Sequence, residues 1–147
     1  MTENKKVILI IDDEVGLRNL LKFRLVSFGY DVLAAEDGYA GIEIAKTMKP
    51  DLVILDIMMP YFNGIEVCKK LKSDYTTKDI PVIFLSVLAQ KEDIEMGKQV
   101  GAEFFLTKPY DPEKLNLVIK MAMNGAHPDK IWGCLGRNAQ AGEDRGV

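Results

Sequence analysis

Short apolar runs alternate along the chain with longer amphipathic segments. Four runs, at residues 7–11, 52–55, 82–85 and 104–106, are continuously apolar, as expected for strands that a parallel sheet buries on both faces. A weaker run at residues 30–35 is interpreted as an edge strand. Because each strand precedes a helical segment, we predict an α/β fold, in which one five-stranded, doubly wound parallel sheet carries helices on both faces.

The segments between these runs carry the signals of helices. In the first segment, apolar residues recur at spacings of three and four and stop before Gly29, where a helix would end. These residues are Leu17, Leu20, Leu21, Leu25 and Phe28. Asn63 and Glu66 match a capping box, and Asp111 precedes a proline suited to a first helical position. We predict further helices at residues 37–48, 63–73, 90–100 and 111–124. The helical stripes and the methionines are assigned to the core.

Composition places the chain among globular proteins and excludes several classes. Its 147 residues are 48% hydrophobic and 28% charged, with a net charge of -3, which is typical of one folded domain. The mild acidic excess provides no broad basic surface, so we expect no direct binding to nucleic acid. No apolar run has the length of a membrane span or of a signal-peptide core. Cys68 and Cys134 lack metal-binding spacing, which favours the reducing cytoplasm and excludes a zinc site.

The composition changes close to residue 125. Residues 125–147 hold five glycines in 23 positions. We therefore predict a domain at residues 1–124 and a C-terminal tail or linker remnant at residues 125–147. The one histidine of the chain, His127, lies in that tail, so chemistry that needs a histidine base inside the domain is excluded.

Polar side chains stand where the predicted strands end. Asp12 and Asp13 follow the first strand, Asp56 the third, Ser86 the fourth and Lys108 the fifth. Each alone has a simpler interpretation, as a helix cap, a turn residue, a loop residue or a satisfied hydroxyl. Because the carboxyl ends of parallel strands meet at one edge of a sheet, we expect all five side chains to converge there.

Three crowded carboxylates determine the chemistry expected of such a site. At separations near 4 Å each pair repels by roughly 4 kcal/mol at an effective dielectric near 20. Lys108 offsets part of this repulsion, and a bound cation would offset the remainder. Because the available ligand atoms are all oxygens, Mg²⁺ is the favoured cation. A magnesium site beside an ammonium and a hydroxyl suits a phosphoryl group. The simplest reaction is attack by Asp56 on an incoming phosphoryl group.

These residues belong to a longer pattern with a known counterpart. The sequence reads IDDE at 11–14, DIMMP at 56–60 with Gly64, Ser86, and GA at 101–102 leading to LTKPY at 106–110. This pattern closely resembles the receiver domain of bacterial two-component response regulators, from residue 5 to about residue 124. The resemblance implies the flavodoxin-like (βα)₅ fold with strand order 2-1-3-4-5.

The resemblance also implies roles for the converging residues. Asp56 would be the phosphoacceptor and would take its phosphoryl group from a sensor histidine kinase or a histidine phosphotransfer protein. Asp12, Asp13, Asp56 and the backbone carbonyl of Met58 would hold Mg²⁺. Lys108 would contact the phosphoryl oxygens, and its peptide bond to Pro109 would be cis.

A switch is implied as well. Ser86 would move toward the phosphoryl group, and Phe105 would turn inward behind it. This movement would reshape the face formed by the fourth helix, the fifth strand and the fifth helix, which is also the face implied for a homodimer. The protein would be no enzyme, since it would catalyse only its own phosphorylation and dephosphorylation.

Three positions depart from the commonest pattern of the family. Val87 stands where a small residue is usual and would narrow the access to Asp56. Met58 and Leu88 occupy the positions that flank the phosphoryl group, and neither apolar side chain can orient a water molecule. We therefore predict slow self-dephosphorylation.

Other functions are less compatible with the sequence. Haloacid-dehalogenase-type phosphatases carry a second aspartate two residues after the nucleophile, where this chain has Met58. Flavin-binding modules need a Ser/Thr/Gly-rich loop after the first strand, where this chain reads DDEVG. An interaction module independent of phosphorylation would usually lack one of the acidic residues or the lysine. A receiver segment of a larger transcription regulator, or of a hybrid kinase, stays open.

Overall fold

The computed structural model describes residues 4–87 and 90–125, and within them it holds the five predicted strands and the five predicted helices in the predicted order. The strands are β1 (Val7–Ile11), β2 (Asp31–Ala35), β3 (Leu52–Leu55), β4 (Val82–Ser86) and β5 (Phe104–Thr107). The helices are α1 (Val15–Ser27), α2 (Gly38–Met48), α3 (Gly64–Ser73), α4 (Lys91–Gln99) and α5 (Pro112–Met123). Nearly all of the predicted tail, with His127 and Cys134, lies outside the described residues, so the predicted domain boundary stays a prediction.

Side-chain caps account for several of the helix starts. Asp37 accepts a hydrogen bond from the Ala40 N–H at 2.8 Å. Asn63 and Glu66 form the predicted capping box, in which each side chain accepts from the backbone N–H of the other residue. Caps of this kind typically stabilise a helix by about 1 kcal/mol. None of the helices in the described ranges is long and apolar enough to cross a membrane.

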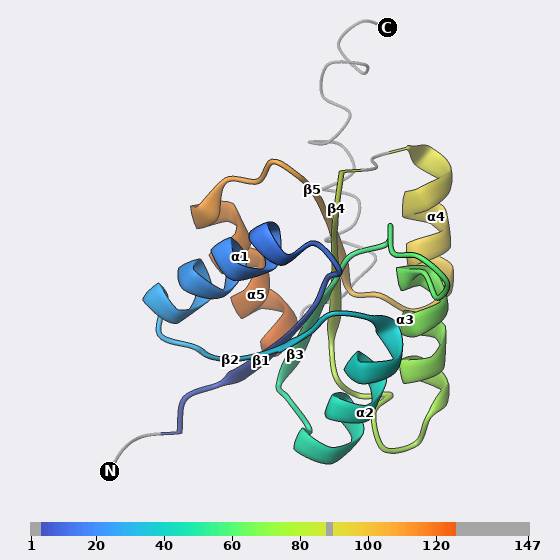
Figure 1. Ribbon diagram of the computed structural model, residues 1–147, viewed down its shortest axis with the longest axis horizontal. Coiled ribbons are helices and arrows are strands. Elements are labelled where there is room, and N and C mark those ends of the chain that lie inside the picture. Colours follow the sequence, from blue (N-terminus) through green and yellow to red (C-terminus); the bar gives the residue numbers. More distant parts are fainter. Residues whose placement is uncertain (1–3, 88–89, 126–147) are drawn as a thin grey trace, which may run out of the picture.

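The sheet is fully parallel, with the strand order β2-β1-β3-β4-β5 (Figure 1). This confirms the predicted strand order. It also confirms that the weaker apolar run at residues 30–35, which forms β2, is an edge strand. The register pairs Ile11 of β1 with Leu55 of β3, both at the last position of their strands. The residues that follow these two, Asp12 and Asp56, therefore lie side by side at one edge of the sheet.

Two layers of helices enclose the sheet and divide the core into two clusters (Figure 1). Helices α1 and α5 cover one face, and α2, α3 and α4 cover the other. Successive residues of β1 alternate between them, with Ile8 and Ile10 in the α1/α5 cluster and Leu9 and Ile11 in the other. Burial on both faces is the reason that the central strands read as continuous apolar runs.

The assignment of all helical stripes and methionines to the core is wrong in part. On α1, Leu21 and Leu25 are buried, whereas Leu17 and Leu20 keep 43% and 48% of their surface exposed. The exposed pair lines an open pocket between α1 and the β5–α5 loop, so it is not part of the buried core. Among the described residues, the exposed methionines are Met48, Met58 and Met96.

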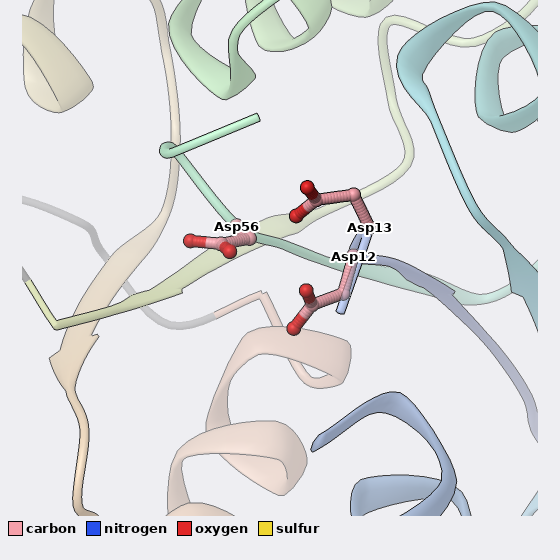
Figure 2. A group of neighbouring side chains, drawn as sticks. All are labelled: Asp12, Asp13 and Asp56. Carbon is pink, nitrogen blue, oxygen red and sulfur yellow. The ribbon is translucent and has the colours of Figure 1, made fainter. Parts of the chain in front are cut away.

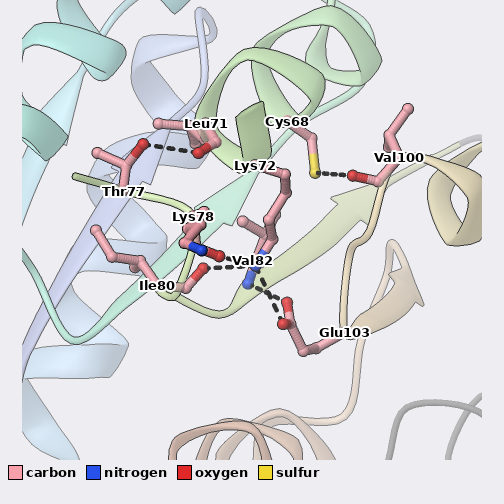
Figure 3. Close-up of polar contacts among 9 residues, drawn as sticks. All are labelled: Cys68, Leu71, Lys72, Thr77, Lys78, Ile80, Val82, Val100 and Glu103. Atoms are coloured by element: carbon pink, nitrogen blue, oxygen red, sulfur yellow. Dashed lines mark hydrogen bonds and ion pairs between the residues drawn. The ribbon is translucent and has the colours of Figure 1, made fainter. Parts of the chain in front are cut away.

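A polar network ties α3 to the starts of β4 and β5, at the opposite end of these strands from Ser86 and Lys108 (Figure 3). The Lys72 ammonium on α3 donates to the backbone carbonyl of Ile80 at 2.8 Å and pairs with the Glu103 carboxylate at 3.1 Å. Glu103 also accepts from the Val82 N–H at 2.7 Å. Lys72 thereby joins α3 to the start of β4 and to the residue before the edge strand β5, which holds the starts of both strands in place.

Candidate functional site

Three carboxylates meet at the carboxyl edge of the sheet, as predicted (Figure 2). Asp12 and Asp13 follow β1 and Asp56 follows β3, and one oxygen of each lies within 4.8 Å of the others. Asp12 and Asp56 are 4% and 9% exposed, whereas Asp13 is open to solvent. The group therefore has a buried floor and one accessible side, by which a ligand can enter.

Lys108 from the end of β5 completes the cluster. Its ammonium lies 3.1 Å from Asp12 Oδ2 and 3.9 Å from Asp56 Oδ2. The backbone anchors it, because the Lys108 N–H donates to the Ser86 carbonyl at 2.8 Å. The Lys108–Pro109 peptide bond is cis, as the family resemblance implied. The arrangement brings one cation to the two buried carboxylates.

Hydrogen bonds from the following turn orient Asp12. Its Oδ1 accepts from the Glu14 N–H at 3.0 Å, which leaves Oδ2 for Lys108. The Arg18 guanidinium donates to the Asp12 backbone carbonyl at 2.7 Å. The sequence analysis did not identify Arg18. The only indication of its role in the sequence is its position, as a basic residue one turn into the helix that follows Asp12 and Asp13. Arg18 positions the backbone of Asp12 and does not contact the carboxylates themselves.

The loop after Asp56 folds tightly over the strand end. The Met58 N–H donates to Asp56 Oδ1 at 3.2 Å, which fixes one oxygen of that carboxylate. Gly64 at the start of α3 packs on the backbone of Asp56 and Ile57 so closely that a Cβ atom would collide with it. The motif glycine is therefore required for close packing at this point.

Burial and charge act on Asp56 in opposite directions. Desolvation is the largest effect and raises the pKa of Asp56 above its ordinary value. The Lys108 ammonium and the Met58 N–H lower the pKa, and the charges of Asp12 and Asp13 raise it. The net result is a raised pKa, and burial of the carboxylate is its main cause.

The donor set fits a small, hard dication. Three carboxylates and one ammonium give a formal charge of -3 + 1 = -2. The donors that converge are all oxygens, and Cys68, the one cysteine within the described residues, is buried in the core on α3. Oxygen donors with an excess of two negative charges are the preferred surroundings of Mg²⁺.

The two predicted switch residues lie on β4 and β5, which pair with each other. Ser86 ends β4 and is fully buried, and Phe105 on β5 is 5% exposed. The Phe105 ring packs against that of Phe84, with the centroids 5.9 Å apart. The structure thus places the hydroxyl and the aromatic ring on adjacent strands, with Phe105 already turned inward.

The rim of the site is apolar where the sequence analysis noted departures. Met58 and Val87 expose 54% and 62% of their surface. Leu88 lies outside the described residues. Positions 58 and 87 therefore carry exposed apolar side chains and no polar group.

Comparison with known proteins agrees with this geometry. The family model for the response regulator receiver domain matches residues 8–120. The DNA-binding dual master transcriptional regulator RpaA of Synechocystis is 44% identical over 108 residues, which are 74% of this chain and 45% of that protein. The transcriptional regulatory protein PhoP of Bacillus subtilis is 40% identical over 117 residues, 80% of this chain and 48% of its own. The chain spans about half the length of the curated relatives that it matches.

Solved structures of single domains match over nearly their whole length. The chemotaxis protein CheY4 of Vibrio cholerae is 29% identical, with a TM-score of 0.77 over 81% of this chain and 99% of that one. A response regulator from Chloroflexus aurantiacus is 26% identical, with a TM-score of 0.79 over 82% and 99%. Sequence and fold therefore indicate the same family.

Proposed function

Because the chain belongs to the response regulator receiver domain family of two-component signalling, we propose that Asp56 accepts a phosphoryl group from a phosphohistidine. The donor would be a sensor histidine kinase or a histidine phosphotransfer protein. The observation that carries the proposal is the position of Asp56. It lies 3.9 Å from the Lys108 ammonium, beside two further carboxylates, and is reached from solvent by one edge.

The reaction needs no base, because an ionised carboxylate is itself the nucleophile. An oxygen of Asp56 forms a bond to phosphorus while the phosphorus–nitrogen bond to the donor imidazole breaks. The bonding electron pair stays on that nitrogen, and no oxidation or reduction is involved. Lys108 balances charge on the phosphoryl oxygens, since its ammonium already reaches the two buried carboxylates.

We further infer that Asp12, Asp13, Asp56 and the backbone carbonyl of Met58 hold Mg²⁺. Receiver domains generally bind this ion in an acidic pocket, and the three carboxylates here lie close enough to share it. When bound, Mg²⁺ supplies positive charge that offsets the repulsion between the carboxylates and an incoming phosphoryl group.

The consequence of phosphorylation would be a switch. Ser86 is proposed to contact the phosphoryl group, with Phe105 packing behind it. The reshaped surface would be the face of α4, β5 and α5, and a homodimer through this face is part of the same proposal. In this scheme the protein catalyses only its own phosphorylation and dephosphorylation and is otherwise no enzyme.

The relatives favour a longer protein with a transcriptional output. The chain matches about half of RpaA and PhoP, both named as transcription regulators. We propose that it is the receiver part of such a regulator, in which another segment would contact DNA. A hybrid kinase is the second candidate, because one structural neighbour is the receiver domain of a signal transduction histidine kinase from Syntrophus aciditrophicus, with a TM-score of 0.75 and 31% identity. A cytoplasmic location stays a prediction.

Intact mass spectrometry tests the central step. The protein would be incubated with acetyl phosphate with and without Mg²⁺. The expected result is a gain of one phosphoryl group that needs the ion and is abolished in Asp56→Ala. The control is Asp31→Ala, which removes an exposed carboxylate at the edge strand and should leave the gain unchanged. An unmodified wild type, or a modified Asp56→Ala variant, would refute the proposal.

A further inference from the structure

Helices α2 and α3 leave an open groove of about 610 Å³ between them. Both helices lie on the side of the sheet opposite α1 and α5 (Figure 1). At one end the rings of Tyr39 and Phe62 meet with centroids 4.8 Å apart, and at the other end Lys46 pairs with Asp74 at 3.3 Å. Tyr39 and Lys46 lie seven positions apart on α2, so the two ends of the groove are about 10 Å apart along the helix.

The groove offers cations that the chain itself does not use. Its two carboxylates are engaged, since Glu66 accepts from the Asn63 N–H in the capping box and Asp74 accepts from Thr76 and Lys46. Lys69 and Lys70 line the same groove and are exposed, and within the described residues no carboxylate lies within ion-pair distance of either. With three lysines and two carboxylates in its lining, the groove has a formal charge of +1, and Lys69 and Lys70 are the cations without an ion-pair partner in the described part of the chain.

Two exposed tyrosines adjoin Phe62, which lines the groove: Tyr39 contacts its ring, and Tyr61 precedes it in the sequence. Tyr39 exposes 69% of its surface and Tyr61 exposes 99%. Tyr61 also has a positive φ of 68°, in the left-handed region, which costs a non-glycine residue about 1 kcal/mol. Neither burial nor a hydrogen bond in the described structure offsets this cost at Tyr61. Tyrosines of this kind are enriched where a protein surface is covered by a partner.

We propose that the α2–α3 groove is a docking site for an acidic segment of a partner protein. An apolar side chain of the segment would pack on Phe62 and Tyr39, and its carboxylates would face Lys69 and Lys70. About three residues of extended chain span 10 Å, which makes a short linear segment sufficient. Glu66 and Asp74 disfavour the closely spaced phosphates of a nucleic acid, whereas a peptide can keep its carboxylates away from them.

This surface goes beyond the proposed phosphorylation and does not depend on it. Phe62 lies six residues after Asp56, in the loop that carries the phosphoacceptor. A partner held in the groove would therefore contact the same loop, although binding itself needs no phosphoryl group. Asp56→Asn should bind the segment as the wild type does, so the two proposals can fail separately.

Fluorescence anisotropy with defined probes tests the proposal. The probes are a labelled peptide of about twelve residues with a central Phe-Leu flanked by glutamates, and the same peptide with lysines in place of the glutamates. The acidic peptide should bind saturably and more weakly at high salt, and the basic peptide should not bind. In Lys69→Glu/Lys70→Glu the dissociation constant should rise by about tenfold or more. Lys69→Gln/Lys70→Gln, a milder change, should give a smaller rise in the same direction.

The matched control reverses two exposed lysines elsewhere. Lys114→Glu/Lys120→Glu on α5 makes the same change in net charge and should alter the dissociation constant by less than about twofold. Equal weakening in both variants would mean attraction by net charge alone and would overturn the proposal. So would the absence of saturable binding below about 1 mM, or tighter binding of a thymidine oligonucleotide that the Lys69/Lys70 variant abolishes. Self-association in sedimentation that this variant abolishes would assign the groove to a second copy of the chain and refute the acidic partner.

Discussion

Gly64 packs directly on the backbone of Asp56, and a Cβ atom at position 64 would lie 2.7 Å from the Ile57 Cα atom. Backbone atoms cannot move aside as a flexible side chain can. Gly64→Ala should therefore displace the loop that holds Asp56 and destabilise the fold by about 1–3 kcal/mol. Urea unfolding measures this loss, and phosphorylation by acetyl phosphate should slow in parallel.

The control for this prediction is Gly16→Ala on α1. Its Cβ atom would meet only the Glu14 side chain, at 3.4 Å. Alanine has the higher helix propensity, so this variant should be unchanged or more stable by up to about 1 kcal/mol. A Gly64→Ala variant as stable as Gly16→Ala would show that the close approach does not hold the loop.

Magnesium binding should separate the aspartates by role. Asp13→Asn removes a ligating charge without replacing it, so we expect the affinity for Mg²⁺ to fall by about tenfold or more. Asp56→Asn should keep part of the affinity while it abolishes phosphorylation. Isothermal titration calorimetry with Mg²⁺ measures both variants, with Asp31→Asn as the control at the edge strand. Equal affinity in wild type and Asp13→Asn would contradict the assignment of the ion site.

The Lys72 network should contribute measurably to stability. Lys72→Met removes the donor to Ile80 and leaves the partly buried Glu103 without its cation. Because Lys72 and Glu103 keep only 15% and 23% of their side chains exposed, we expect a loss of about 1–3 kcal/mol in urea unfolding. Lys70→Met, an exposed lysine of the same helix, should change stability by less than about 0.5 kcal/mol. A loss of the same size in both variants would remove the special role of Lys72.

Sequence patterns fixed those parts of the fold that depend on burial and spacing. Continuous apolar runs identified the strands because β1, β3 and β4 are buried on both faces. The convergence of Asp12, Asp56 and Lys108 followed from their place after parallel strands. The strand order 2-1-3-4-5 came from family resemblance, since periodicity alone does not order the strands.

Other features need three-dimensional contacts that no local pattern encodes. The apolar spacing on α1 does not reveal that Leu17 and Leu20 line an open pocket, because that depends on where the β5–α5 loop runs. Arg18 contacts the backbone of Asp12 across a turn, and the Lys72 network joins residues 31 positions apart. Such contacts follow from the packing of elements, which the sequence determines only through the whole fold.

Asp74 should give the fold a distinct dependence on acid. Its hydrogen bonds from Thr76, with the ion pair to Lys46, lower its pKa from 3.8 to about 2. Since the folded pKa is below the unfolded one, the stabilisation is present above about pH 4 and is lost as the pH falls toward 2. Asp74→Asn should thus be less stable than wild type at neutral pH, and the difference should shrink through this window. Thr76→Val, followed by NMR titration, should return the pKa of Asp74 toward 3.8; an unchanged titration would exclude the threonine as the cause.

The apolar rim should make the phosphorylated state long-lived. Met58 stands two residues after Asp56 with 54% of its surface exposed, and its side chain cannot orient a water molecule toward phosphorus. Met58→Asn/Leu88→Glu supplies polar groups at both flanking positions, and hydrolysis should accelerate by about tenfold or more, as expected when an attacking water is positioned. The decay of the phosphorylated band on a phosphate-affinity gel, after removal of acetyl phosphate, measures the lifetime. Met48→Asn changes an equally exposed methionine on α2 and should leave the lifetime as it is. If the double variant decays no faster than Met48→Asn, the rim does not control hydrolysis.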